Sequence, residues 1–356
     1  MRLLLIGPLP PPIGGATVLF KQLADELLSH PDIQLHILNT ARSSTTHAKS
    51  LYSALQVLLG IIRHSPQADI ISFHASLNGA LLFGPVIHLL CLLLGKKWIF
   101  RGFGGGFDSW YQRAPALSRS IFKLGVLRAD TILLERQSST TFFQRLTDRP
   151  VQWYANSRKC EPKEQDSTSI NTFINTLPAK RFVFVGHVKK EKGIRDIIEA
   201  AQLINGHFLV DIYGPLDEAI SAASLNTDKV AYRGVLKPDA VISTLTHYDV
   251  LLLPSYWKGE GYPGVILEAY CAGIPVIASR WGGIPEIVSD ASGILIEPQD
   301  SRALAEAMES LTKSSAKMLE LRRGAAAMAD KFSSTAWTKT FLDINRRLVR
   351  TDYPSK

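Results

Sequence analysis

Residues 254–279 read PSYWKGEGYPGVILEAYCAGIPVIAS, and this stretch decides the fold. It follows an apolar run over 248–253, which predicts a buried strand. A polar, glycine-rich turn with Glu260 comes next, then a helical stretch that carries Glu268, then a second buried strand over 274–278. A strand, a loop, a helix and a strand form a βαβ unit. Its loop lies at the carboxyl edge of a parallel sheet, where such sheets bind ligands.

The two glutamates have seven residues between them. With a helix beginning near Pro263, Glu268 lies in its second turn and faces the crevice that Glu260 overhangs. A pair of surface glutamates on an ordinary βαβ unit is the plain alternative. Read with PS before it and LEAYCAGIPVIAS after it, however, the spacing resembles the E-x7-E signature of retaining nucleotide-sugar glycosyltransferases of family 4.

That resemblance implies the α/β fold called GT-B, in which two Rossmann-like domains with parallel sheets face each other across a cleft. It is strongest over residues 181–311 and continues more weakly over 1–135. It implies that Glu268 accepts hydrogen bonds from the ribose hydroxyls of the donor and that Glu260 contacts the donor sugar. The residues between them complete the implied donor contacts: Gly261, Tyr262, Pro263, Gly264 and Val265.

The length of 356 residues exceeds one usual core and predicts two domains. A polar linker separates a first domain over residues 1–165 from a second domain over 178–335. The resemblance implies that the first binds the acceptor and the second binds the donor. By the same resemblance, a last helix over about 336–356 packs back on the first domain. The N-terminus has only six residues before Gly7, which predicts a first strand and not a signal peptide.

The basic excess is confined to the N-terminal half. Residues 1–160 hold 17 Lys and Arg against 8 Asp and Glu, while the rest holds 23 against 24. No helix-turn-helix, RNA-recognition or zinc pattern accompanies this charge, so no nucleic-acid partner is expected. An anionic membrane surface or a diphosphate-bearing lipid fits an α/β enzyme better, and a solvated face without a partner is the alternative.

The longest apolar run, ALLFGPVIHLLCLLL over 80–94, falls short of a membrane span and contains Pro85 and His88. It predicts a buried crossover helix, with a membrane-dipping helix as the minor alternative. The three cysteines, Cys91, Cys160 and Cys271, have neither metal nor disulfide spacing. They predict free thiols in a reducing cytosol. The basic N-terminal half favours a protein that is peripheral on the inner face of the cytoplasmic membrane.

Two glycine-containing turns precede predicted helices and suit a phosphate. Gly14 and Gly15 follow the first strand, and Lys192 precedes a second amphipathic helix. A tight turn and a solvated lysine are the plain alternatives. The stretch GHVKKEKG over 186–193 resembles the family pattern G-R-x-x-x-x-K-G, so Gly186 and Lys192 match, whereas His187 replaces the arginine. The resemblance places all these residues at the donor diphosphate.

Other donor and acceptor contacts are assigned more loosely. The resemblance places the nucleotide base at the end of the strand over 230–235, through Arg233, Gly234 and Val235. On the acceptor side the candidates are His74, at the end of a strand, with Arg101 and Asp108 around the loop RGFGGGFD. Many family members carry a histidine near this loop that contacts the transferred sugar; here Phe103 precedes the three glycines.

The implied reaction transfers a sugar from a nucleoside diphosphate, with UDP favoured, to a hydroxyl of a glycan or lipid-linked glycan, with retention of the anomeric configuration. Glu260 and Lys192 are the predicted catalytic residues, and neither a cofactor nor a metal is expected. The setting would be bacterial surface polysaccharide or lipopolysaccharide synthesis. Two alternatives stay open: a non-hydrolysing nucleotide-sugar epimerase of the same fold, and a sugar-nucleotide-binding protein that has lost catalysis.

Overall fold

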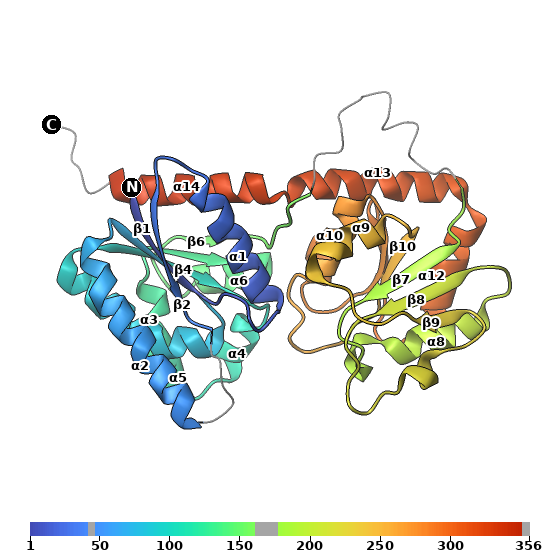
Figure 1. Ribbon diagram of the computed structural model, residues 1–356, viewed down its shortest axis with the longest axis horizontal. Coiled ribbons are helices and arrows are strands. Elements are labelled where there is room, and N and C mark those ends of the chain that lie inside the picture. Colours follow the sequence, from blue (N-terminus) through green and yellow to red (C-terminus); the bar gives the residue numbers. More distant parts are fainter. Residues whose placement is uncertain (42–46, 161–176, 351–356) are drawn as a thin grey trace. The chain divides into compact units, whose positions relative to one another are not determined.

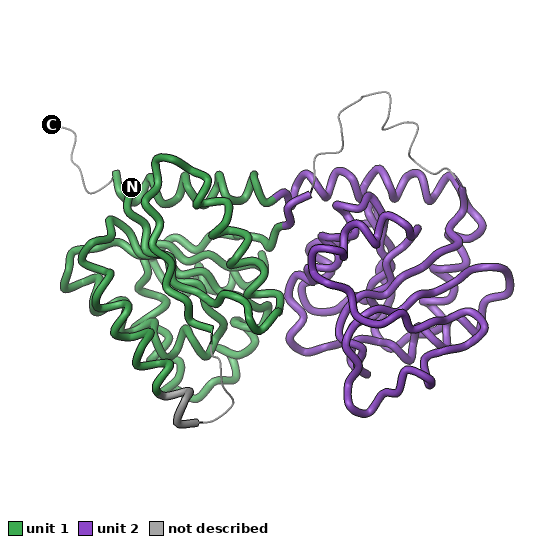
Figure 2. The backbone as a smooth tube through the Cα atoms, viewed as in Figure 1, with its two compact units in different colours: residues 1–157, 334–356 green, residues 158–333 purple. Residues whose placement is uncertain are grey.

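The structure is a computed structural model that describes residues 1–41, 47–160 and 177–350. It divides into two compact units (Figure 2). The first contains residues 1–157 and the C-terminal residues from 334 onward, and the second contains residues 158–333. The last helix, α14 (Ser334–Arg350), is therefore part of the first unit, as expected from the sequence.

The first unit is built on a six-stranded parallel sheet with the order β2-β1-β3-β4-β5-β6. Each strand is short and most are buried on both faces, which is why they read as continuous apolar runs in the sequence. The strands are β1 (Arg2–Gly7), β2 (Gln34–Asn39), β3 (Ile70–Ala75), β4 (Lys97–Gly102), β5 (Thr131–Leu134) and β6 (Val151–Trp153).

Helices cover both faces of this sheet (Figure 1). On one face α1 (Gly15–Leu28) packs against α14, where the Thr338 hydroxyl donates to Glu26 at 2.5 Å. On α14 the apolar side chains of Trp337, Phe341 and Ile344 are buried. The other face carries α2 (His47–His64), α3 (Leu77–Leu94), α4 (Phe107–Arg113), α5 (Ala116–Leu124) and α6 (Gln137–Gln144).

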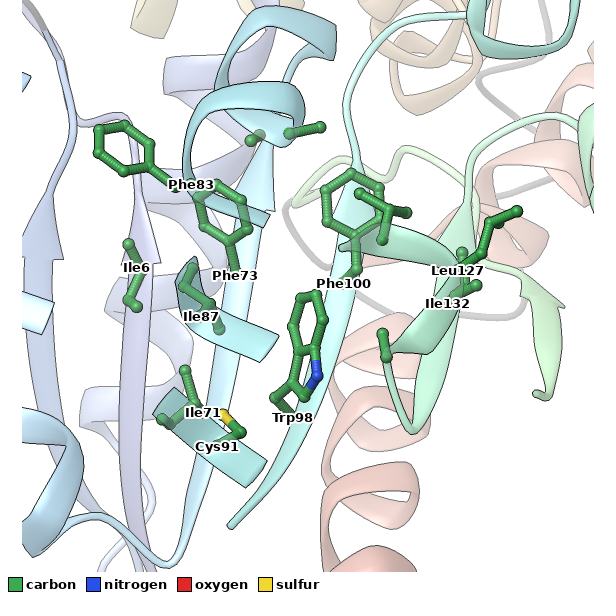
Figure 3. Packing of buried hydrophobic residues seen from close by; sticks show 14 of the residues in the cluster. Ile6, Ile71, Phe73, Phe83, Ile87, Cys91, Trp98, Phe100, Leu127 and Ile132 are labelled. Atoms are coloured by element: carbon green, nitrogen blue, oxygen red, sulfur yellow. The ribbon is translucent and has the colours of Figure 1, made fainter. Parts of the chain in front are cut away.

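A large apolar core lies between the sheet and this second group of helices (Figure 3). Phe73, Trp98 and Phe100 project from neighbouring strands and meet Ile87 and Cys91 of α3. The predicted crossover helix is thus present between β3 and β4. Among the described helices, α3 is the one long and apolar enough to cross a membrane by length and composition. Only 28% of the residues of α3 are buried, so the expectation of a buried helix is met on one side of it and not on the other.

The second unit has its own six-stranded parallel sheet, in the order β12-β11-β10-β7-β8-β9. The strands are β7 (Arg181–Val185), β8 (Leu209–Tyr213), β9 (Val230–Tyr232), β10 (Val250–Leu253), β11 (Val276–Ser279) and β12 (Gly293–Ile296). The helices are α8 (Ile194–Leu203), α9 (Val241–Leu245), α10 (Gly264–Ala272), α11 (Ile284–Ile287), α12 (Ser301–Lys313) and α13 (Ser315–Lys331). The βαβ unit predicted from residues 254–279 is β10–α10–β11.

The boundaries of that unit have local causes. Helix α10 begins directly after Pro263, a residue that lacks a backbone N–H and so suits the start of a helix. It ends at Gly273, which has φ of +76°. A residue with a Cβ is disfavoured in that left-handed conformation, so glycine is the usual stop. Two Rossmann-like units of this kind make up the GT-B fold class.

Candidate functional site

The predicted donor residues gather at the carboxyl edge of the second sheet. The loops after β7 and β10 carry Lys192 and Glu260, and the loop after β11 carries Gly282 and Gly283. All strands of the sheet are parallel, so these loops emerge at one edge, where α/β sheets bind ligands.

Lys192 and Glu260 form an ion pair at the carboxyl edge of the second sheet. The distance from Lys192 Nζ to Glu260 Oε2 is 2.6 Å, and the two side chains are 15% and 5% exposed. The Ser255 hydroxyl donates to the same carboxylate oxygen. The buried carboxylate is therefore held in one orientation by a cation and a hydroxyl, which is how a mostly buried charge is accommodated.

Two close backbone contacts, each made at a glycine, hold the loops that carry Lys192 and Glu260 in place. Gly193 follows Lys192 with φ of +75°, and a Cβ at Gly193 would collide with the carbonyl oxygen of Pro254. Gly282 has φ of +57°, and its Cβ would collide with the carbonyl oxygen of Glu260. Both positions demand glycine, which explains why the Lys-Gly and Gly-Gly pairs of the sequence border the site.

Trp257 lies beside the two lysines of the turn after β7. The ammonium groups of Lys189 and Lys192 lie 4.6 and 5.0 Å from the centre of its ring. Such cation–π contacts orient the two lysines and hold their ammonium groups beside the Trp257 ring. His187, where the family pattern has an arginine, is exposed at the start of the same turn.

Glu268 lies on α10 and is paired with Arg158. The Nε of Arg158 donates to Glu268 Oε1 at 2.7 Å, and Arg158 is largely buried. A Cβ at Gly264 would collide with the Arg158 guanidinium, so the glycine at the first position of α10 gives the arginine its place. No local pattern in the sequence predicts that Arg158 pairs with Glu268, which lies 110 residues away.

The expectation of three free cysteines is wrong. Cys160 and Cys271 form a disulfide, with their Cα atoms 5.1 Å apart and a sequence separation of 111 residues. The last turn of α10 packs against the segment that follows Arg158, and no local spacing reveals such a pairing. Cys91 is free and buried in the first core, where burial raises the pKa of its thiol to about 12.

The loops after β7, β8 and β9 meet through glycines. Gly186 and Gly214 have positive φ, and a Cβ at Gly214 would collide with the Gly186 carbonyl oxygen. The Gly214 N–H donates to Gly234 O at 2.8 Å. Arg233 donates from Nε to Asp211 Oδ1 at 2.7 Å, which raises the pKa of its half-exposed guanidinium. Val235 is exposed.

The remaining predicted donor residues follow Glu260 directly. Gly261, Tyr262 and Pro263 are buried, and Gly264 and Val265 are half-buried. The Tyr262 hydroxyl donates to Glu286 Oε2 on α11 at 2.8 Å, which ties the loop after β10 to the loop after β11. Within the described ranges, no group of three or more His, Cys, Asp or Glu side chains is arranged to hold a metal ion.

In the first unit, Gly14 and Gly15 mark the start of α1 as predicted. The Gly14 N–H donates to Thr17 Oγ1 at 2.9 Å, and Thr17 donates to Pro12 O at 2.9 Å. A Cβ added at Gly14 or Gly15 would meet no atom within 4 Å. Packing in the described part of the chain therefore does not demand glycine here, and the role of these residues at a phosphate stays a prediction.

Two of the three acceptor-side candidates lie in the core. His74 is 0% exposed, shares a hydrogen bond of 2.9 Å with Ser72, and has its ring near those of Phe20 and Phe341. Arg101 is 3% exposed and stacks on Tyr154 at 4.4 Å. These side chains point from the sheet toward the face covered by α1 and α14, so the structure corrects the expectation that they face an acceptor.

Burial lowers the pKa of both His74 and Arg101. The pKa of His74 lies well below its usual value, and the positive charge of Arg101 is the second cause. Phe103, which stands where relatives were expected to have a histidine, lies 5.0 Å from the Arg101 guanidinium. Asp108 is half-buried in the first turn of α4 and lies 3.8 Å from Arg136.

A polar network around the three-glycine loop includes residues that were not predicted from the sequence. Glu135 accepts from the Gly104 N–H at 3.3 Å and from Asn156 Nδ2 at 3.1 Å, and Arg136 donates to Gly105 O at 2.6 Å. Glu135 and Arg136 directly follow β5. The rule that located the other candidates, polar residues at the carboxyl end of a strand, would have found them.

Comparison with known proteins finds a family model that matches the part of the chain carrying this site. Residues 171–328 match the model of the family "Glycosyl transferases group 1". The 2-deoxystreptamine glucosyltransferase of Streptomyces kanamyceticus is 34% identical over 160 residues, 42% of this chain and 41% of that protein. The N,N'-diacetylbacillosaminyl-diphospho-undecaprenol alpha-1,3-N-acetylgalactosaminyltransferase of Campylobacter jejuni is 27% identical over 163 residues, 45% of this chain and 42% of that protein. The matched part is thus less than half of each.

Solved structures resemble the chain over almost its whole length. Sucrose-phosphate synthase from Thermosynechococcus elongatus has a TM-score of 0.74 at 17% identity and covers 98% of this chain and 99% of its own. Anabaena HepE, solved in complex with UDP, has a TM-score of 0.70 at 14% identity and covers 98% and 100%. These likenesses show the shared GT-B fold. The similarity to the family "Glycosyl transferases group 1" covers residues 171–328, which are less than half of the chain and contain the Lys192–Glu260 pair and Glu268.

Proposed function

We propose that this protein is a retaining glycosyltransferase that moves a sugar from a nucleoside-diphosphate sugar, with UDP as the favoured nucleotide, to a hydroxyl group of a glycan. The observation that carries the proposal is the Lys192–Glu260 ion pair at the carboxyl edge of the second sheet. It lies within the residues that match the family model. The UDP complex of HepE, a protein of the same fold, supports the choice of nucleotide.

The residues at the carboxyl edge of the second sheet suit the different parts of a nucleoside-diphosphate sugar. Lys192 supplies a positive charge next to the start of α8, where helix N–H groups also favour an anion. The diphosphate would take over the ammonium group that Glu260 neutralises in the free protein. Glu260 would then accept hydrogen bonds from the donor sugar, and Glu268 would accept them from the ribose hydroxyls.

In the proposed reaction, the bond between the anomeric carbon and the diphosphate oxygen breaks while the acceptor oxygen bonds to the same face of that carbon. The acceptor proton passes to a departing phosphate oxygen, so no protein base is needed. Lys192 stabilises the negative charge that accumulates on the leaving diphosphate, and Glu260 favours positive character at the anomeric carbon. Because Lys192 supplies this charge, we expect the reaction to need no cofactor.

The acceptor is proposed to be a lipid-linked glycan in bacterial surface polysaccharide synthesis, bound through the first unit. The C. jejuni relative is named for an undecaprenol-linked acceptor. The basic excess of residues 1–160 suits an enzyme that works at an anionic membrane. We therefore propose a peripheral position on the inner face of the cytoplasmic membrane.

The test is turnover of UDP-glucose, UDP-galactose and their N-acetyl forms with and without a membrane extract as the source of acceptor. The proposal predicts release of UDP that depends on the extract and radiolabelled sugar in its lipid fraction. Conversion of one UDP-sugar into another without an acceptor would show an epimerase instead. Nucleotide binding without any turnover would indicate a protein that has lost catalysis.

A further inference from the structure

Three neighbouring helices of the first unit expose many large apolar side chains. Helices α2, α3 and α5 lie side by side on one face of the sheet (Figure 1). Their outward side, here called the leucine face, carries Tyr52, Leu55, Leu59, Ile62, Leu82, Leu89, Leu92, Leu93, Leu117 and Leu124. Leu92 and Leu93 are 70% and 73% exposed. Contiguous exposed apolar surface of this kind marks a site of interaction with a partner or a membrane.

The charges around the leucine face are of one sign. Between Ile33 and Ala129 the sequence has two acidic residues, Asp69 and Asp108, and neither lies on α2, α3 or α5. Exposed basic side chains accompany the leucines: Arg63 at the end of α2, and Arg119 and Lys123 on α5. A second copy of this chain would bring the same positive charge to the interface. An anionic lipid bilayer offers hydrocarbon and negative charge together.

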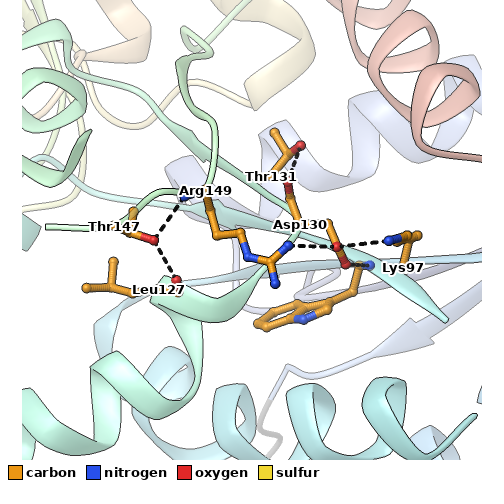
Figure 4. Close-up of polar contacts among 7 residues, drawn as sticks. Lys97, Leu127, Asp130, Thr131, Thr147 and Arg149 are labelled. Atoms are coloured by element: carbon orange, nitrogen blue, oxygen red, sulfur yellow. Dashed lines mark hydrogen bonds and ion pairs between the residues drawn. The ribbon is translucent and has the colours of Figure 1, made fainter. Parts of the chain in front are cut away.

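A basic cavity adjoins the leucine face at the end of α3. It has a volume of about 260 Å³, and Leu92 forms part of its wall. Its charged lining consists of Lys96, Lys97, Arg128, Arg149 and Asp130. Arg149 and Lys97 lie 3.4 and 3.5 Å from Oδ1 of Asp130 (Figure 4). One carboxylate cannot balance four cationic groups, so the cavity keeps a positive excess.

This cavity is distinct from the sites described above. It lies at the amino ends of β4, β5 and β6, because Lys97 opens β4 and because Asp130 and Arg149 precede β5 and β6. Arg101 is near the opposite, carboxyl end of β4. Nothing in the proposed donor or acceptor chemistry uses residues at the amino edge of the sheet.

We propose that the leucine face is a membrane-docking surface and that the adjoining cavity binds the phosphate of an anionic lipid headgroup. The leucines enter the boundary between headgroups and acyl chains while the basic side chains reach the phosphates, as in other proteins that lie on a membrane. The inference rests on the membrane position proposed above and names the surface responsible. Its test reads lipid binding without sugar transfer, so failure of either proposal is recognised separately.

The experiment is flotation of the full chain with vesicles of phosphatidylcholine alone and of phosphatidylcholine mixed with phosphatidylglycerol. The charge variant is Lys96→Gln with Arg128→Gln, which leaves both ion pairs of Asp130 in place. Its matched control is Arg302→Gln with Arg323→Gln, two exposed arginines of the second unit. The apolar variant is Leu93→Ser, and its control is Leu203→Ser, an exposed leucine in the last turn of α8.

We expect the wild type and both controls to bind the mixed vesicles, less so at high salt, and to bind pure phosphatidylcholine weakly. The charge variant should lose about 30-fold in partition coefficient, the value for two cationic groups at an anionic surface. Leu93→Ser should lose about tenfold or more, as expected for removing one leucine from the apolar phase. Unfolding temperatures of all variants verify that the chains are folded.

Four results would overturn the proposal in whole or in part. The first is absence of binding to the mixed vesicles, and the second is binding that the charge and leucine variants retain. The third is a dimer of the wild type, measured by light scattering, that Leu93→Ser dissociates, because a second copy would then cover the leucine face. Equal binding to neutral and anionic vesicles would remove the headgroup site from the cavity.

Discussion

Lys192 and Glu260 contact each other across 68 residues of sequence, with Nζ 2.6 Å from Oε2 at the carboxyl edge of the second sheet. Each residue explains the other's position. The mostly buried carboxylate is neutralised by the lysine, and the lysine is held at the loop edge by this carboxylate and by Trp257. A preformed cation of this kind needs no reorganisation when negative charge develops beside it.

Lys192→Ala should lower kcat by about 10²–10³, the usual cost of losing one preorganised electrostatic stabiliser. The matched control is Lys190→Ala, an exposed lysine of the same turn, which should keep kcat within a factor of about two to three, less than 1 kcal/mol. Initial rates of UDP release give both values. A near-wild-type kcat for the Lys192 variant would remove this residue from the chemistry.

Glu268→Gln should weaken nucleotide binding, because an amide is a poorer acceptor than a carboxylate for two ribose hydroxyls. A loss of about 1.5–3 kcal/mol, the value of a hydrogen bond to a charged group, corresponds to roughly 10- to 150-fold in Kd. Isothermal titration with UDP measures it. Arg158→Gln removes the ion pair from the other side and is the control, since it leaves the carboxylate free to bind ribose.

If both substitutions weaken UDP binding equally, the site requires the ion pair and not the carboxylate alone. If neither does, Glu268 has a structural role. Thermal unfolding without nucleotide separates these cases from simple destabilisation of α10.

Reduction of the Cys160–Cys271 disulfide should lower the free energy of unfolding by about 2–4 kcal/mol, because a closed loop of 111 residues limits the unfolded chain. The check is denaturant unfolding with and without dithiothreitol. The control variant is Cys271→Ser, whose stability should not respond to the reductant. Mass spectrometry of a non-reduced digest that finds both thiols free would contradict the pairing.

The buried His74 should make the protein less stable in mild acid. Its pKa is near 6.5 in the unfolded chain and well below that value when folded, so the unfolded state binds the proton first. The stabilising contribution is complete above pH 6.5 and is lost as the pH falls below it, at up to about 1.4 kcal/mol per pH unit for one proton. Urea unfolding of the wild type and of His74→Gln between pH 7.5 and 5 isolates this slope. Identical slopes would show that His74 is not responsible.

The sequence predicted the parts of the molecule that are encoded locally. The strand, loop, helix and strand over residues 248–279 appear as β10–α10–β11, because apolar periodicity, Pro263 and Gly273 each act within a few residues. The same holds for α1 after Gly14 and for α14, whose apolar stripe is buried.

Contacts between residues that are far apart in the sequence could not be predicted from local patterns. Arg158 and Glu268 are 110 residues apart, and Cys160 and Cys271 are 111 apart. Their meeting depends on how the segment after β6 passes α10, which no local pattern records. His74 illustrates a different limit. The end of β3 was located correctly, but the direction of one side chain depends on which helices cover each face of the sheet.

The most direct test of the central claim is a thermal-shift measurement with UDP, GDP, ADP, CMP and dTDP, first without metal and then with Mg²⁺, on the wild type and on Lys192→Ala. A ligand present at 100 times its Kd adds about 2.7 kcal/mol to the free energy of unfolding, which this assay resolves. We predict that UDP stabilises the wild type without metal and stabilises Lys192→Ala less. Stabilisation by none of these nucleotides would contradict the account.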